Sequence, residues 1–192
     1  MAFNTKVYTE QGGDRQVVAS GGSVDIESGG EIDVESGASL KLAGTAVSAT
    51  AAEINQAADP ASRYESLVTT EAMVVTDNGK TFLLNLAGGF TVTLPTVAVA
   101  GAGFWCKFIV GTAPTTAYII TEDGGSDTNV CIGGINELEV DTASDGPYSA
   151  AFTFVNLVAS VAVVVDWVEY FCDGTSWYIT GQTNADGGIT LT

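Results

Sequence analysis

Residues 22–44 repeat on an eight-residue period, and this repeat constrains the fold more than any other feature of the chain. Three copies follow one another, and in each copy apolar residues alternate with charged or polar ones. Such alternation is typical of a half-buried strand, with the aliphatic side chains on one face and the charged side chains on the other. A Ser-Gly pair before each copy indicates a turn. The aliphatic positions are Val24, Ile26, Ile32, Val34, Leu40 and Leu42.

A single copy of residues 22–44 is not expected to fold alone. Burying six aliphatic side chains stabilises a fold by less than the conformational entropy lost in ordering about twenty residues of backbone. Three chains wound around one axis could share the aliphatic face and pair one another's strand edges. We therefore predict an intertwined homotrimeric β-shaft over residues 20–45, with the six aliphatic side chains in the trimer core. The alternative is an acidic Gly/Ser linker with accidental alternation.

The charged face of the predicted shaft is strongly acidic. A solvated negative surface is the simplest interpretation of it, and docking on a basic partner is one alternative. Specific cation binding is another, since hard cations take several carboxylate oxygens, but the nine-residue spacing of calcium-binding β-rolls is absent. We therefore expect no metal site. The acids concerned are Asp25, Glu27, Glu31, Asp33 and Glu35.

The charge balance and the missing histidine exclude several classes of function. The chain has 23 acidic and 6 basic residues, a formal net charge of −17, and no Lys or Arg follows Lys107. Phosphate contacts need clustered cations, so we expect neither nucleic acid nor an anionic membrane surface as a partner. With no histidine, imidazole catalysis and His-ligated metals are excluded. We expect no enzyme, no catalytic residue and no cofactor.

Residues 1–19 are expected to form an extended N-terminal arm. They are apolar and aromatic, are the least acidic part of the chain, and show no secretion signal. One interpretation is a partly ordered terminus that caps the shaft, and the other is an anchor that docks on a partner. The candidate anchoring residues are Phe3, Lys6, Val7, Tyr8, Arg15, Val17 and Val18.

Residues 46–66 are expected to form a short helical collar. The spacing of Thr50 and Glu53 matches a capping box and predicts the start of a helix. Ile54 lies on one narrow apolar stripe of that helix and is expected in the trimer core, and Asp59-Pro60 ends the helix. Residues 62–65 match the box again and predict a second helix. Because isolated helices this short are marginally stable, a three-helix collar is the natural arrangement.

Residues 67–192 are expected to form the C-terminal domain. Roughly nine or ten strands, separated by turn signals and without helical periodicity, predict an antiparallel β-sandwich that most simply resembles a jelly roll. The only long apolar run, residues 152–171, contains Asn156, Asp166 and Glu169 and suits two buried strands better than a membrane helix. The three cysteines lie in apolar surroundings without metal-binding spacing and are expected to be reduced structural thiols.

Trp167, Trp177 and Tyr178 are candidate contacts for a host surface glycan, because exposed aromatic rings can stack on sugars. Packing in the core is the commoner fate of such side chains. Around Trp167 the alternation places Val168 and Tyr170 on another face from Trp167, which leaves room for exposed aromatic rings.

Three passages resemble a known group of proteins. Residues 45–55, TAVSATAAEIN, are similar to the T-x-T-A-A-E-[LI]-N segment of structural fibre and head-decoration proteins of tailed bacteriophages. The segments 77–95 and 163–181 look like the β-rich C-terminal domains that accompany it. None of the three is a catalytic signature.

This resemblance implies a homotrimer that is attached to the virion by its N-terminal part and projects its C-terminal domains outward. The short chain favours a capsid decoration or head-fibre protein, with the phage major capsid protein as partner. It would lie on the outer capsid surface after assembly in the host cytoplasm. The alternative is a tail-fibre or host-receptor module that binds glycans.

Overall fold

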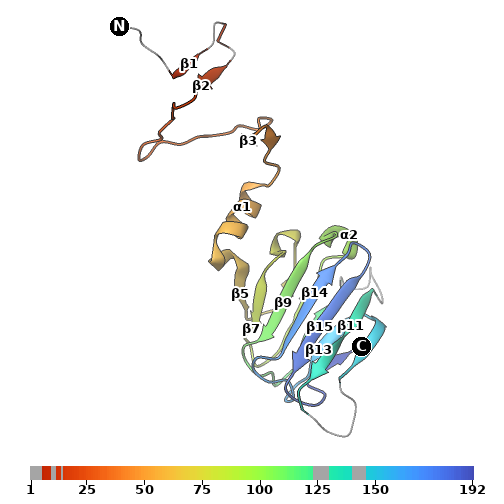
Figure 1. Cartoon of the computed structure of the whole chain (residues 1–192). Helices are drawn as coiled ribbons and strands as arrows, with labels where there is room; N and C mark the ends of the chain where they lie inside the picture. The colour runs from red at the N-terminus through yellow and green to blue at the C-terminus, as the bar shows by residue number, and fades with distance from the viewer. Residues whose placement is uncertain (1–5, 10–11, 14, 123–129, 140–145) are drawn as a thin grey trace. The chain divides into compact units, whose positions relative to one another are not determined.

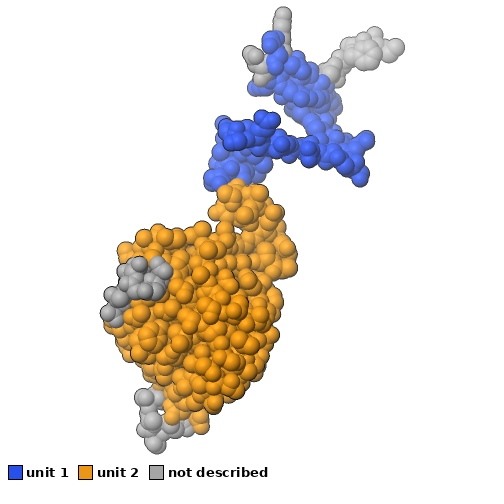
Figure 2. Space-filling model, turned by 180° about the vertical axis from the view of Figure 1, so that it is seen from behind, with its two compact units in different colours: residues 1–48 blue, residues 49–192 orange. Residues whose placement is uncertain are grey.

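The structure, a computed structural model, describes residues 6–9, 12–13, 15–122, 130–139 and 146–192. The chain forms two compact units, residues 1–48 and residues 49–192 (Figure 2). It is mainly β, as the sequence predicts. None of the helices in the described part is long and apolar enough to cross a bilayer.

The first unit contains two short hairpins. Strands β1 (Val7–Thr9) and β2 (Gln16–Val18) pair antiparallel, so the expected extended arm is a hairpin. Strands β3 (Lys41–Leu42) and β4 (Thr45–Ala46) also pair antiparallel. Ala43 and Gly44 join β3 to β4 with φ values of 49° and 85°. Positive φ at both central residues is the signature of a type I′ turn, which matches the twist of a hairpin.

The eight-residue period appears in the structure as three equivalent turns. Their closing hydrogen bonds run from Gly22 N to Ala19 O (2.8 Å), from Gly30 N to Glu27 O (2.8 Å) and from Ala38 N to Glu35 O (3.0 Å). The third residue of each turn is a glycine with positive φ, as a type II turn requires: Gly21 (75°), Gly29 (88°) and Gly37 (88°). Residues 22–39, all of them described, belong to no strand of the same chain.

The second unit is a two-sheet domain preceded by short helical elements. Its elements are α1 (Ala51–Ala58), η1 (Pro60–Arg63), β5 (Tyr64–Leu67), β6 (Glu71–Ala72), η2 (Val75–Asp77), β7 (Thr81–Leu84), β8 (Thr91–Thr93), α2 (Val97–Ala100), β9 (Trp105–Val110), β10 (Tyr118–Thr121), β11 (Cys131–Glu137), β12 (Tyr148–Phe152), β13 (Phe154–Leu157), β14 (Trp167–Cys172), β15 (Trp177–Thr183) and β16 (Ile189–Leu191). The larger sheet has the order β12-β11-β15-β14-β9-β7-β5, and the smaller has the order β16-β13-β10-β8-β6 (Figure 1).

Both sheets are mixed, so the prediction of an antiparallel sandwich is wrong. Five strand pairs are parallel: β5–β7, β7–β9, β6–β8, β8–β10 and β11–β15. From β5 to β11, successive strands alternate between the two sheets, and sheet neighbours from β5 to β10 are therefore two strands apart in the chain. In this part of the chain the predicted turns connect a strand of one sheet to a strand of the other sheet. Hairpin turns would instead have paired consecutive strands antiparallel within one sheet.

One hydrophobic core lies between the two sheets. Phe82 of β7 and Phe108 of β9 stack with ring centroids 5.3 Å apart. Trp177 of β15 meets Phe104 and Tyr170 edge to face. The three cysteines are buried thiols, as predicted: Cys106, Cys131 and Cys172.

The helical segment agrees with the prediction only in its first half. In α1, Thr50 Oγ1 accepts a hydrogen bond from Glu53 N (3.2 Å), and Thr50 N donates to Glu53 Oε2 (2.7 Å). The predicted second helix over residues 62–65 is wrong, because η1 ends at Arg63 and strand β5 begins at Tyr64. Pairing of β5 with β7 outweighs the local capping signal. Helix α2 was not predicted.

Candidate functional site

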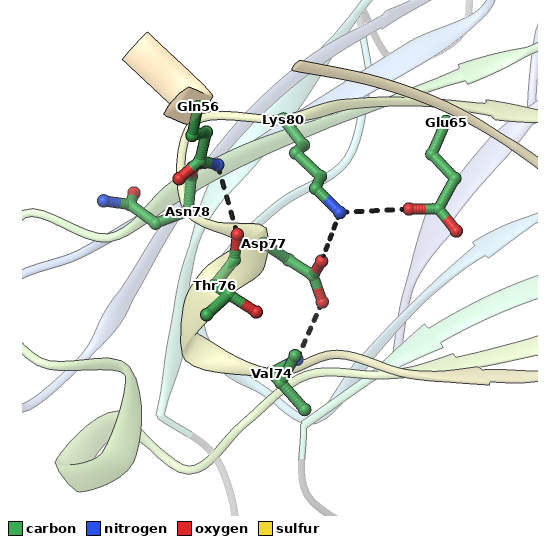
Figure 3. A network of polar contacts seen from close by, with 7 residues as sticks. All are labelled: Gln56, Glu65, Val74, Thr76, Asp77, Asn78 and Lys80. Carbon is green, nitrogen blue, oxygen red and sulfur yellow. Dashed lines mark hydrogen bonds and ion pairs between the residues drawn. The ribbon is translucent and has the colours of Figure 1, made fainter. Parts of the chain in front are cut away.

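Helix α1 faces its own domain with its polar side. The amide Nε2 of Gln56 donates to the carbonyl oxygen of Thr76 within η2 (3.1 Å; Figure 3) and to that of Asn78, which follows η2. Between the helix and η2 lies a groove of about 620 Å³. The helix contributes Ala52, Glu53, Asn55 and Gln56 to the groove, and Val75, Thr76, Asn78 and Lys80 line it from the β domain.

An ion-pair network holds the domain side of this groove. Lys80 Nζ lies 2.7 Å from Asp77 Oδ1 and 3.1 Å from Glu65 Oε2 (Figure 3). Asp77 Oδ2 accepts a hydrogen bond of 2.8 Å from Val74 N. Partial burial by itself lowers the pKa of Lys80, but its hydrogen bonds to Asp77 and Glu65 raise the pKa by more. Lys80 therefore stays charged, and its ion pairs connect η2 to β5.

The apolar stripe of α1 points away from its own domain. In an α-helix each residue is rotated by about 100° from the previous one. The four residues of the apolar stripe thus lie on the side opposite the groove, and all are exposed: Ala51, Ile54, Ala57 and Ala58. Surface helices normally turn the apolar stripe inward. The orientation of α1 is the reverse, and the helix buries none of its residues.

The aliphatic side chains of the repeat are also exposed in the single chain. Exposure ranges from 44% for Val34 to 73% for Ile32. Six aliphatic side chains at equivalent positions of a regular turn repeat form an apolar surface that its own chain leaves uncovered. The residues predicted to form a trimer core are therefore accessible in the single chain: Val24, Ile26, Ile32, Val34, Leu40, Leu42 and Ile54.

The predicted anchoring residues come together in the β1–β2 hairpin and beside it. Val7 and Val18 are directly opposite each other, as are Tyr8 and Val17. Lys6 Nζ donates to Gly21 O at 3.2 Å and so connects the arm to the first turn of the repeat. Arg15 is exposed immediately before β2, whereas Phe3 lies outside the described residues.

The three candidate glycan-binding aromatics have different environments. Trp177 has an exposure of 0% and belongs to the core, so its assignment as a surface contact is wrong. Its strand has one sheet face buried and one exposed, and Trp177 falls on the buried face while Tyr178 falls on the exposed one. Trp167 is half-buried, with Lys107 Nζ 3.8 Å from its ring centroid. Val168 and Tyr170 are buried on the opposite face from Trp167, as predicted.

Two further exposed aromatics lie beside Tyr178: Trp105, whose ring is also a candidate for stacking on sugars, and Phe171, which was not predicted. Trp105 of β9 pairs with Phe171 of β14, which in turn pairs with Tyr178 of β15. Strand alternation could have indicated their exposure. Trp105 is adjacent to the buried Cys106 in β9, and Phe171 is adjacent to the buried Cys172 in β14, so each aromatic side chain lies on the opposite face of its strand from a buried cysteine. The described residues contain no group of three or more side chains that could hold a metal ion.

Comparison of the chain with protein-family models found no match, and comparison with curated proteins found none.

Proposed function

We propose that this chain is a non-enzymatic homotrimeric structural protein of a tailed-phage virion that decorates the outer capsid surface. The observation that carries the proposal is the orientation of α1, whose polar side contacts its own domain while Ile54 and three alanines face outward. An apolar helix stripe that its own domain leaves exposed is stabilised by packing against another chain.

The repeat and the helix favour the same mode of association. The aliphatic residues between the three turns, Val24, Ile26, Ile32 and Val34, are exposed and belong to no strand of their own chain. Copies of the chain around one axis would supply both the missing hydrogen bonds and the missing apolar cover. The small side chains of Ala51, Ala57 and Ala58 would permit close approach of three helices at the end of the shaft. These features support a trimer with the shaft over residues 20–45.

The hairpin β1–β2 is the proposed attachment element. It combines exposed apolar side chains, Tyr8 and Val18, with Lys6 and Arg15, in a chain that is otherwise strongly acidic. The proposed partner is the major capsid protein. Three hairpins in one trimer would bind together, and the effective concentration of the second and third hairpin would strengthen a weak individual contact. The assignment to a phage capsid depends on the resemblance of residues 45–55 to decoration and fibre proteins.

Three measurements test the proposal. Native mass spectrometry of the full chain should give three times the chain mass of 19.7 kDa, and a monomer at micromolar concentration would contradict the trimer. Particles that lack this protein should bind the full chain, whereas a chain without residues 1–19 should remain trimeric and fail to bind. Equal binding by both chains would contradict the role of the hairpin. Imaging of labelled chains should place them on the head, and a position on the tail would favour the fibre alternative.

A further inference from the structure

A row of aromatic side chains crosses the outer face of the larger sheet. Trp105, Phe171 and Tyr178 are in register on the neighbouring strands β9, β14 and β15, and their exposures are 40%, 46% and 45%. Neighbouring strands are about 4.8 Å apart, so these rings form one continuous apolar strip. Figure 1 shows the three strands side by side within the sheet.

A second row of polar residues runs beside the aromatic row. Lys107, Glu169 and Thr180 are in register on the same three strands, two residues along from the aromatic positions. Between the two rows lies a hollow of about 150 Å³. It is lined by Glu169, Phe171, Tyr178, Ile179 and Thr180. A carboxylate and two aromatic rings therefore border one small hollow.

Among the described residues, no lysine or arginine forms an ion pair with the carboxylate of Glu169. Lys107 is its direct cross-strand neighbour, but the Lys107 ammonium lies over the ring of Trp167 instead. Within the described part of the chain, no hydrogen bond or ion pair reaches the Glu169 carboxylate, although this residue is half-buried. Removing an unpaired carboxylate partly from water costs free energy, and a cation bound beside it would offset that cost.

A second negative charge lies at the other end of Tyr178. Asp173 lies close enough to Tyr178 for its charge to raise the pKa of the Tyr178 hydroxyl. The Asp173 carboxylate accepts hydrogen bonds from Thr175 Oγ1 (2.8 Å), Thr175 N (2.8 Å) and Ser176 N (2.8 Å), and these bonds lower the pKa of Asp173. Glu169 thus puts a negative charge at the hollow itself and Asp173 puts another beyond Tyr178, so an anionic ligand would be repelled.

We propose that this hollow binds the cationic side chain of a lysine or arginine from an exposed basic segment of a partner protein. A cation placed there would pair with Glu169 and lie against the electron-rich faces of Phe171 and Tyr178. The net charge of −17 would draw a basic segment to this surface before the specific contact forms. The inference concerns the outer face of the β domain and is independent of the proposed capsid attachment.

The test uses the full chain and three blocked tripeptides, Lys-Lys-Lys, Arg-Arg-Arg and Gln-Gln-Gln, in calorimetric titrations at low ionic strength. The two basic peptides should bind and the glutamine peptide should not. Glu169→Gln should weaken binding of the basic peptides by about tenfold, since it removes the charge partner. Tyr178→Ala should weaken it several-fold, and Tyr178→Phe should retain most of it because the ring is kept.

A matched control separates the site from general electrostatic attraction. Glu27→Gln removes the same charge from the exposed repeat and should leave peptide binding within twofold of the parent chain. Equal weakening by Glu169→Gln and Glu27→Gln, or no binding of the basic peptides by the parent chain, would overturn the proposal. Binding of a neutral oligosaccharide such as maltotriose that is lost in Tyr178→Ala but kept in Glu169→Gln would also overturn it, in favour of a glycan site. Thermal melting of each variant shows that the domain remains folded.

Discussion

The hydroxyl of Thr183 donates a 2.9 Å hydrogen bond to the carboxylate of Asp166, and both residues are excluded from solvent. The same carboxylate accepts from Val163 N (2.9 Å) and from both the backbone and the side-chain nitrogen of Asn184 (2.9 and 3.0 Å). Asp166 directly precedes β14, and Thr183 ends β15. One buried acid therefore ties the start of one strand to the end of its neighbour.

Replacing this acid should strongly destabilise the domain. Asp166→Ala removes the acceptor of four hydrogen bonds, one of them from the fully buried hydroxyl of Thr183, and we expect a loss of about 3 kcal/mol in the free energy of unfolding, measured by chemical denaturation. Asp166→Asn should cost less, because one acceptor oxygen remains. Asp186→Ala, at an exposed acid in the nearby turn, should stay within about 0.5 kcal/mol of the parent chain. Similar stabilities of Asp166→Ala and Asp186→Ala would contradict the network.

Stability should depend on the ionisation of Asp173 in acid. The Thr175 hydroxyl, and then the amides of Thr175 and Ser176, lower the pKa of Asp173 from 3.8 to about 2. Since the folded-state pKa is the lower one, the charged form stabilises the fold above pH 4 or so, and this contribution is lost as the pH falls towards about 2. The melting temperature of Asp173→Ala should lie below that of the parent chain by a constant amount between about pH 7 and 5.

Below about pH 4 this difference in melting temperature should shrink. Asp173→Asn keeps an acceptor for the turn but cannot ionise, and its own difference from the parent chain should shrink in the same pH window. A difference for Asp173→Ala that stays constant down to pH 2 would show that the carboxylate charge has no part in the turn.

A charge on the outward stripe of α1 should weaken self-association. Ile54→Asp places a carboxylate where an exposed aliphatic side chain is expected to meet its copies, and the concentration at which the oligomer dissociates should rise at least about tenfold. Sedimentation equilibrium measures this concentration. Val99→Asp changes another exposed aliphatic residue, on α2 (59% exposed against 47% for Ile54), and should leave association unchanged. An unaltered dissociation concentration for Ile54→Asp would exclude the helix stripe from the interface.

The turn glycines of the repeat should be individually important. Gly29 and Gly37 have φ of +88°, and a Cβ at either position would meet nothing within 4 Å. An alanine there is unfavourable only through its backbone, by about 1–2 kcal/mol per site. Gly29→Ala should lower the denaturation midpoint of the proposed trimer at fixed chain concentration, and Ser28→Ala in the same turn should not. Equal midpoints for the two variants would show that the turns do not contribute to the stable form.

The cysteines should report on unfolding of the β domain. Burial raises the pKa of the Cys106 and Cys131 thiols, and nearby acids add to the shift. Thiol reagents attack the thiolate, so the native chain should react with less than one equivalent of a disulfide reagent while the denatured chain reacts with three. Ser28→Cys should add one rapidly reacting thiol. Rapid reaction of the native parent chain would contradict the burial of these residues.

Features that depend on near neighbours in the chain could be predicted from the sequence. The capping box of Thr50 and Glu53 and the turn glycines at eight-residue spacing are local, because their hydrogen bonds join residues three apart. The opposite faces of Trp167 and Val168 follow from the geometry of a strand wherever it lies. The predictions of these elements agree with the structure because each depends only on residues close together in the sequence.

Features that depend on distant partners could not be predicted in this way. Residues 64–67 form a strand because residues 81–84 lie beside them, although the local pattern favours a helix. Alternation shows that Trp177 and Tyr178 point in opposite directions, but only the second sheet decides that Trp177 is the buried one.

The sequence by itself determined where the chain turns, where α1 begins and which residues share a face, since these follow from backbone geometry over a few residues. The tertiary structure decided that successive strands cross between two sheets and that α1 turns its polar side to its own domain. Those outcomes depend on which apolar surfaces of one chain can be buried against each other. The stripe at Ile54 and the aliphatic residues of the repeat are apolar surfaces that the single chain leaves exposed.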